Sequence, residues 1–319
     1  MKAGIVLLVC LVGALTALVA DDVSPKLRIE PGRIVVPKGD QMRRPAGEIV
    51  SLDLVTRTGT LRHETSGEIL PFVVLPYAWL FHHGAQGDLR DYRIGEWVTL
   101  RLHQDEKGGW TWLTYIQDDL RRMLNHREFF HVDRIDTARG HLVCTLGNTD
   151  RSFIRRAPGA FLIETDQGTR FWKAGRAASF ADIKRGDQLL ARLHGTGQGS
   201  RRIAWEIFLD EISAAEFSRS QGAIHSQRMV KEGVPGYVDV VEGRSVELTL
   251  FHEGHDQAAT LSPGHTVKVA IAGADRVALE PALRGVVLRR EGDRLMIEIS
   301  QETPPGFVVG GVFRLWPAP

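Results

Sequence analysis

The chain has 319 residues, of which 43% are apolar and 25% charged, and its formal net charge is +1. This balance lacks the basic surplus of nucleic-acid-binding proteins, so no nucleic-acid partner is expected. Beyond residue 20 the sequence contains one cysteine, Cys144, which excludes an intramolecular disulfide in that part of the chain. About 300 residues exceed one small core, and two or three domains are therefore expected.

Residues 1–20 are typical of a secretory signal peptide. Lys2 precedes an apolar run over residues 3–20, which Asp21 and Asp22 end abruptly. Cleavage after Ala20 would place the protein outside the cytoplasm, in the periplasm or secreted. The alternative is an uncleaved helix that anchors the chain, because the run approaches the ~20 residues that span a bilayer. No further membrane span is expected.

Residues 21–46 contain prolines at positions 25, 31, 37 and 45, separated by short apolar pieces. Proline is confined to the edges of sheets, so this segment predicts an extended lead-in with one edge strand.

Four segments have the alternation of β-hairpins on both sides of a polar turn: 47–64, 129–146, 236–250 and 284–299. Further strands are predicted at 110–116 and 202–209. Short strands with frequent turn signals are typical of small sandwiches or barrels.

One segment recurs without gaps 91 residues downstream. Residues 84–103 read GAQGDLRDYRIGEWVTLRLH, and residues 175–194 read GRAASFADIKRGDQLLARLH. Glycines, an aspartate and a closing Arg-Leu-His fall at matching positions. A repeat of this length predicts a duplicated structural module.

Two segments, 116–128 and 209–233, have helical periodicity, and each follows a set of strands. Acidic residues start both helices, where capping and the helix dipole explain them. The apolar residues of each segment share one face: Ile116, Leu120, Met123 and Leu124 in the first, and Ile212, Ala215, Ile224 and Met229 in the second.

These elements predict a mainly β protein of three tandem small antiparallel barrels, OB- or SH3-like, with helices after the first two. The expected organisation is a signal peptide (1–20), a proline-rich lead-in (21–46), a barrel with a short helix (47–128), a barrel with a longer helix (129–232) and a C-terminal barrel (233–319).

The run GTRFWKAGRAASFADIKRGDQLLARLHG (168–195) resembles a family of exported bacterial small-barrel repeats of unknown function. In that family, a strand and a small-residue stretch lead to a turn of aspartate, a hydrophobe, two further residues, glycine and an acid. Both repeats fit this pattern, whereas the third unit has Pro263-Gly264 without the aspartate. The resemblance implies a structural motif and brings no catalytic residues. More distantly, the chain resembles the oligonucleotide/oligosaccharide-binding (OB) barrel.

Each copy of the repeat ends with an arginine and a histidine. Strand alternation places Arg101 and His103 on one face, and Arg192 and His194 on the matching face of the second copy. The functional interpretation is a duplicated anion or metal site. The structural interpretation is an exposed polar face whose arginines pair with neighbouring acids, which is common in antiparallel sheets.

Two aromatic rows have strand spacing. Trp110 and Trp112 form one row, and Tyr77, Trp79 and Phe81 form the other. Exposed, such rows could stack on sugars or bases, and Trp110 and Trp112 are candidate ligand contacts. Buried, they are barrel core.

Residues 252–256 (HEGHD) crowd three kinds of metal ligand into one predicted turn. A metal site requires three or four ligands, and this segment supplies two convincing donors, His252 and His255. They are candidate metal ligands, with a solvated hairpin tip as the simpler alternative. The adjacent His82 and His83 are expected to face opposite ways in a strand. A divalent metal is the one cofactor left open.

We expect a non-catalytic binding or structural module of the cell envelope, with an unidentified ligand in a groove between barrels. The alternatives are a metal-dependent hydrolase that uses the region of His252 and His255, and a carbohydrate-binding protein that uses the aromatic rows. The chain has no nucleophile elbow, phosphate-binding glycine loop or dinucleotide fingerprint. Its partner is not identified by the sequence, and an envelope component or a polysaccharide remains open.

Overall fold

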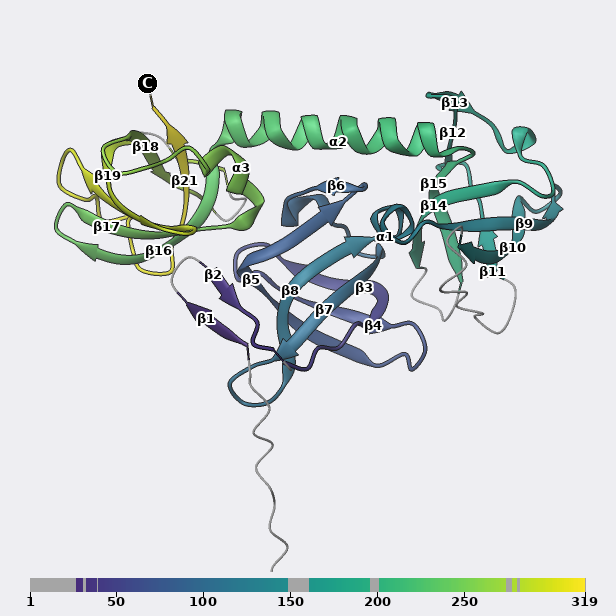
Figure 1. The fold of residues 1–319 in the computed structure, drawn as a ribbon, viewed down its shortest axis with the longest axis horizontal. Coiled ribbons are helices and arrows are strands. Elements are labelled where there is room, and N and C mark those ends of the chain that lie inside the picture. Colours follow the sequence, from purple (N-terminus) through teal and green to yellow (C-terminus); the bar gives the residue numbers. More distant parts are fainter. Residues whose placement is uncertain are drawn as a thin grey trace, which may run out of the picture.

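The computed structural model describes residues 27–30, 33–38, 40–148, 161–195, 201–273, 277–279 and 282–318. The predicted signal peptide lies outside the described residues. Within them, three small closed barrels follow one another along the chain, and barrel 1 lies between the other two (Figure 1). The predicted mainly β fold with three tandem barrels is confirmed.

Barrel 1 closes through five strands in the ring order β3–β4–β5–β8–β7. These strands are β3 (Ala46–Asp53), β4 (Thr58–His63), β5 (Ile69–His82), β7 (Trp97–Gln104) and β8 (Trp110–Asp118). Their alternating apolar residues point inward, and Ile49, Leu61 and Leu100 are fully buried. The pair β5–β8 is parallel, and the other pairs of the ring are antiparallel.

Barrel 2 has the same ring order, β9–β10–β11–β15–β14, with one parallel pair, β11–β15. Its strands are β9 (Glu128–Asp136), β10 (His141–Asn148), β11 (Phe161–Glu164), β14 (Gln188–Gly195) and β15 (Arg202–Phe208). Numbered from the first strand of each barrel, the order is 1-2-3-5-4, which is the order of the OB barrel. The expected antiparallel pairing therefore has one parallel exception in each of these barrels. Cys144 lies in β10 and is fully buried.

Barrel 3 closes through six strands, all paired antiparallel, in the order β16–β17–β20–β19–β18–β21. The strands are β16 (Val234–Glu242), β17 (Ser245–Leu250), β18 (Thr266–Ile271), β19 (Leu283–Glu291), β20 (Arg294–Ile299) and β21 (Val312–Pro317). Between β17 and β18 lie a short 3-10 turn, η3 (His252–Gly254), and one turn of helix, α3 (His255–Ala258). This order differs from that of the first two barrels.

The sequence repeat is a structural repeat with the same offset. In barrel 1, β6 (Ala85–Gln86) and η1 (Leu89–Asp91) precede β7, and in barrel 2, β12 (Arg170–Lys173), β13 (Arg176–Ala178) and η2 (Phe180–Asp182) precede β14. Gly95 and Gly186 occupy the turn before the strand with φ of 90° and 94°, a conformation that favours glycine. The repeated motif thus forms the turn that leads into β7 and β14.

The first helix, α1 (Asp119–His126), packs between barrels 1 and 2. Leu120 and Met123 are buried there with the core of barrel 2, as the periodicity predicts. Ile116, by contrast, ends up in β8.

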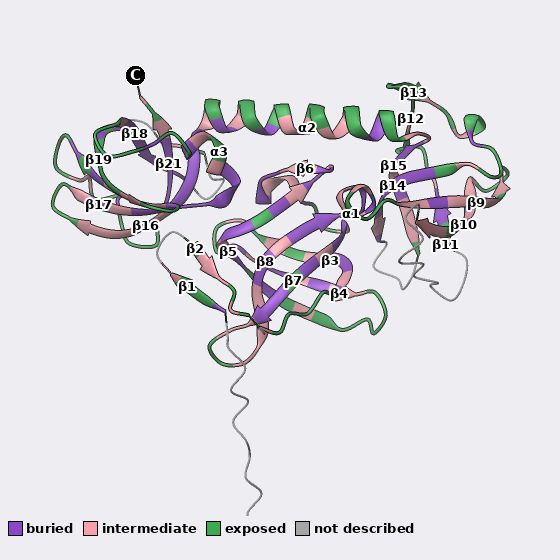
Figure 2. Cartoon of the chain, viewed as in Figure 1, coloured by how far each residue is buried: buried purple, intermediate pink, exposed green. Residues whose placement is uncertain are grey.

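The second helix, α2 (Glu211–Glu232), runs from barrel 2 to barrel 3 and passes over β6 of barrel 1 (Figure 1). Its outer face is exposed (Figure 2). The predicted apolar stripe is wrong: Ile212, Ala215 and Ile224 are exposed, and Met229 alone of the four is buried. Polar contacts of the inner face include Gln221 with His83, His225 with the carbonyl of Glu253, and Arg228 with Asp91. Near its start, the helix also packs Phe217 against Phe208 of barrel 2.

The lead-in forms a separate hairpin of β1 (Arg28–Glu30) and β2 (Arg33–Val35). Arg43 then forms a bridge with Leu102 of β7, which attaches the segment to barrel 1. None of the helices in the described ranges has the length and hydropathy of a membrane span.

We predict that Gly186→Ala lowers the free energy of unfolding by about 1–2 kcal/mol, because its φ disfavours a side chain. No atom lies within 4 Å of the added Cβ, so the cost is conformational. Gly222→Ala in α2 is the control: its Cβ would meet Ala85 at an ordinary 3.5 Å, and alanine favours the helix by about 0.5–1 kcal/mol. Urea unfolding would measure both variants, and equal effects would contradict the prediction.

Candidate functional site

The repeated Arg and His positions have different environments in the two copies. Arg101 is exposed, whereas Arg192 is buried; His103 is buried, whereas His194 is half-buried. In both strands the pairing register shifts immediately after the arginine, which interrupts the alternation. The expected shared polar face is therefore absent from β7 and β14.

Arg192 lies at the junction of barrels 1 and 2, among carboxylates from both. Its Nη2 is 2.8 Å from Glu96 Oε1, its Nε is 3.1 Å from Asp118 Oδ2, and its Nη1 is 2.6 Å from Glu206 Oε2. His82 Nε2 also lies 3.0 Å from Glu96 Oε1. All five side chains are buried. The cluster therefore joins barrels 1 and 2 through ion pairs that are shielded from solvent.

The same cluster shifts the pKa values of its acids in opposite directions. Burial opposes ionisation of Glu96, but His82 and Arg192 outweigh it and lower its pKa to about 2. For Asp118, burial dominates over the attraction of Arg192, and its pKa is raised. Burial also raises the pKa of the adjacent Asp119 to about 6. Asp118 caps α1 by accepting from Arg121 N, so its predicted capping role is confirmed.

His82 and His83 do not face opposite ways. His83 has a φ of 55°, which ends the extended strand and brings the two ring centroids to 3.7 Å. The backbone N–H of His83 donates to Asp118, and its Nδ1 lies 2.8 Å from Gln221 Oε1 of α2. Burial and the charge of Arg192 lower the pKa of His83 to about 2, so its ring stays neutral.

A second buried ion pair joins barrels 1 and 3. Arg57 Nη1 lies 2.5 Å from Glu253 Oε1, and the guanidinium lies 4.0 Å from the ring centroid of Phe251. The Arg57 Nε also donates to the carbonyl of Val74. Barrel 1 is thus fixed to each neighbour by a buried arginine.

His103 forms a hydrogen-bonded series within barrel 1. Its Nδ1 lies 2.5 Å from Asp40 Oδ2, and its Nε2 lies 3.0 Å from Thr114 Oγ1. The order of groups is that of a catalytic triad. All three side chains are buried, however, and Asp40 belongs to the lead-in. The series therefore fastens the lead-in to barrel 1.

The two aromatic rows have different exposure. Tyr77 is buried, whereas Trp79 is 45% exposed, and its ring is stacked with Phe81 at 5.7 Å. Phe81 contacts Tyr115 of β8 at 5.3 Å between ring centroids. Arginines cover the ends of this group, with Arg121 at 4.2 Å over Phe81 and Arg101 at 4.4 Å over Tyr115. We call Trp79, Phe81 and Tyr115 the aromatic strip.

Trp110 and Trp112 are half-buried. The guanidinium of Arg43 covers the Trp110 ring at 4.6 Å. This row is thus partly covered by the lead-in.

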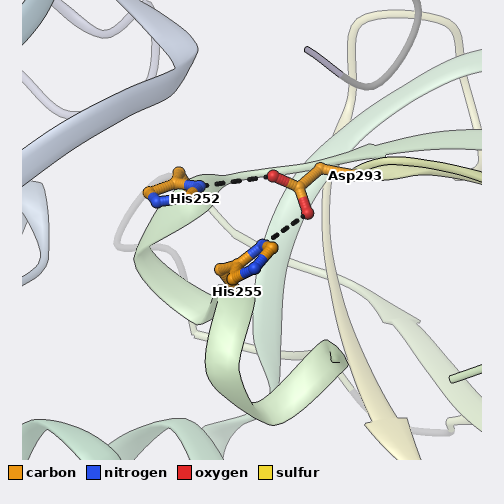
Figure 3. A group of neighbouring side chains, drawn as sticks. All are labelled: His252, His255 and Asp293. Carbon is orange, nitrogen blue, oxygen red and sulfur yellow. Dashed lines mark hydrogen bonds and ion pairs between the residues drawn. The ribbon is translucent and has the colours of Figure 1, made fainter. Parts of the chain in front are cut away.

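His252 and His255 lie beside an acid that the sequence analysis missed. Both rings direct Nδ1 toward Asp293, from the turn between β19 and β20 (Figure 3). His252 Nδ1 is 3.3 Å from Oδ2, and His255 Nδ1 is 2.9 Å from Oδ1. Burial raises the pKa of Asp293, but the hydrogen bonds from both histidines outweigh it, so the pKa lies below its ordinary value. The three residues form a group that could hold a metal ion.

Asp293 could have been found from the predicted hairpin at 284–299, whose turn contains it. What the sequence does not show is that β20 pairs with β17. That pairing places the Asp293 carbonyl 2.7 Å from the amide nitrogen of Leu250, next to His252.

We predict that Arg192→Met destabilises the protein by about 3–5 kcal/mol, because it leaves three carboxylates buried without their shared cation. The matched control is Arg101→Met at the equivalent position of the first copy, where an exposed contact with Tyr115 is worth about 0.5–1 kcal/mol. Urea unfolding compares them. Similar midpoints would show that the cluster contributes little.

Because the pKa of His83 is lowered, we predict that the free energy of unfolding decreases in acid. The unfolded chain takes up a proton near pH 6.5, whereas the folded chain excludes it down to about pH 2, so this contribution is full above pH 6.5 and declines as the pH falls. Asparagine tolerates the positive φ and does not titrate. The difference in the free energy of unfolding between His83→Asn and the wild type should therefore shift by about 2 kcal/mol in favour of the variant when the pH falls from 8 to 5. His131→Asn serves as control, because the side chain of His131 is 44% exposed. Parallel stability curves for His83→Asn and the wild type would refute this.

Comparisons with known proteins supply no relative. A scan against protein-family models finds no match, and a search of the curated proteins also finds none. The resemblance to exported small-barrel repeats therefore stays a prediction, and the barrels by themselves identify no family. Conclusions about function have to come from the arrangement of the side chains.

Proposed function

We propose that the protein is an exported, non-catalytic binding module of the cell envelope, with a carbohydrate as the ligand class. The observation that carries the proposal is the aromatic strip on barrel 1, where Trp79 is 45% exposed and stacked with Phe81. Flat apolar faces of sugar rings stack on such rings, and the near-zero net charge gives no reason to favour a nucleic acid.

The fixed arrangement of the barrels supports a binding role. Arg192 ties barrel 2 to barrel 1, and Arg57 ties barrel 3 to barrel 1. The strip lies on the central barrel, and Trp79 also contacts His252 of barrel 3 at 4.0 Å between ring centroids. A surface held in this way loses little conformational entropy when a ligand binds.

The strip also has polar groups at its margin. Tyr115 Oη donates to Gln117 Oε1, and Arg101 and Arg121 cover neighbouring rings. Hydroxyl-rich ligands need hydrogen-bond partners beside the stacking surface, and the guanidinium groups can supply them.

A metal-dependent hydrolase is the second candidate, and His252, His255 and Asp293 favour it. Hydrolysis also needs a hollow for the substrate beside the metal. The described residues line two shallow hollows, one beside Glu247 and Arg289 and one beneath α2 beside His82, and neither is lined by His252, His255 or Asp293. Because none of the three residues lines either hollow, a non-catalytic role is preferred.

We predict that oligosaccharides of glucose or N-acetylglucosamine quench the tryptophan fluorescence of the protein, and that Trp79→Ala abolishes saturable binding. Calorimetry would confirm the loss, because the variant also removes one fluorophore. Trp110→Ala is the control, since Trp110 lies outside the strip and is less exposed than Trp79. Binding that survives Trp79→Ala, or that requires Trp110 instead, would overturn the assignment of the strip. No binding by the wild type would leave a structural role.

A further inference from the structure

We propose that His252, His255 and Asp293 form a binding site for one divalent transition-metal ion, with zinc as the best match. The site would use two imidazole nitrogens and a carboxylate, which is a donor set that zinc accepts readily. The proposal does not depend on a carbohydrate ligand, because it concerns a different group of residues.

The geometry of the donors carries the proposal. Two ligands of a tetrahedral zinc site with bonds of about 2.1 Å lie about 3.4 Å apart. The nitrogen–oxygen separations here are 3.3 and 2.9 Å, and the three donor atoms lie within 4.8 Å of one another. The upper limit of 4.8 Å exceeds the separation expected between two zinc ligands. A small movement of the His255 side chain would shorten it, because 42% of that side chain is exposed and the residue lies at the start of the short helix α3.

A second observation is a buried nitrogen without a partner. His252 is buried, and among the described residues its Nε2 has no hydrogen-bond partner. Arg290 reaches Asp293 Oδ1 at 4.0 Å, but its Nη1 donates to the carbonyls of Ala258 and Leu261. The nearest partners of the Asp293 carboxylate are thus the two histidines.

Three protein ligands leave at least one coordination position for water or another ligand. Such a site is of the open kind, which differs from the closed four-ligand sites that serve structure alone. It would also join two parts of barrel 3 that are separate in sequence, the η3–α3 segment and the β19–β20 turn (Figure 3).

The test is direct titration of the purified, chelator-treated protein with zinc and with cobalt. We expect about one ion per chain, and a visible absorption of bound cobalt that reports imidazole and carboxylate coordination. His255→Ala and Asp293→Asn should each weaken binding by about tenfold or more. His265→Ala, an exposed histidine of the same barrel, is the matched control and should bind as the wild type does.

A second readout uses Trp79, whose ring lies 4.0 Å from that of His252. Bound copper should quench its fluorescence, and Trp79→Phe should remove that part of the quenching without removing the ion. Circular dichroism would establish that each variant is folded. The proposal fails if the wild type binds no stoichiometric metal, or if His255→Ala and Asp293→Asn both bind as tightly as His265→Ala.

Discussion

Buried arginines join the central barrel to its two neighbours, and the larger of the two ionic clusters centres on Arg192. Arg192 comes from barrel 2, yet two of its three carboxylate partners, Glu96 and Asp118, belong to barrel 1. Ions lose hydration when they are buried, and here that cost is opposed by three ion pairs, because each nitrogen of the guanidinium meets a carboxylate. Because burial and attraction compete in this cluster, the pKa of Glu96 is lowered whereas that of Asp118 is raised.

The duplication explains how such a joint could arise from two similar modules. The turn, the 3-10 segment and the strand coincide between the copies at the same offset, and even the register shift after the arginine is shared. The environments nevertheless diverge, because β14 faces barrel 1 whereas the equivalent side of β7 remains exposed at Arg101. Arg192 thus joins two barrels, whereas Arg101 at the equivalent position covers the ring of Tyr115.

Local chemistry explains what could be predicted from the sequence. Hairpins, turn glycines and helix caps depend on neighbours a few residues away, so all four hairpins and both helices were correctly placed. The contacts that define the candidate sites span long distances in sequence, such as Arg57 with Glu253 and His252 with Asp293. Periodicity also misled for α2, because three of the four apolar residues that it groups are exposed, and the helix contacts its neighbours through a mixture of polar side chains and other apolar ones, such as Phe217.

The length of α2 has a geometric consequence. Its 22 residues extend about 33 Å, which sets the separation between the barrels at its two ends. One inserted residue would advance everything beyond it by about 1.5 Å and rotate it by about 100°. His225 would then turn away from the Glu253 carbonyl, and Arg228 from Asp91. The helix therefore fixes both the distance between barrels 2 and 3 and their relative rotation. Substitutions on its outer face leave both unchanged, whereas a change in its length alters both.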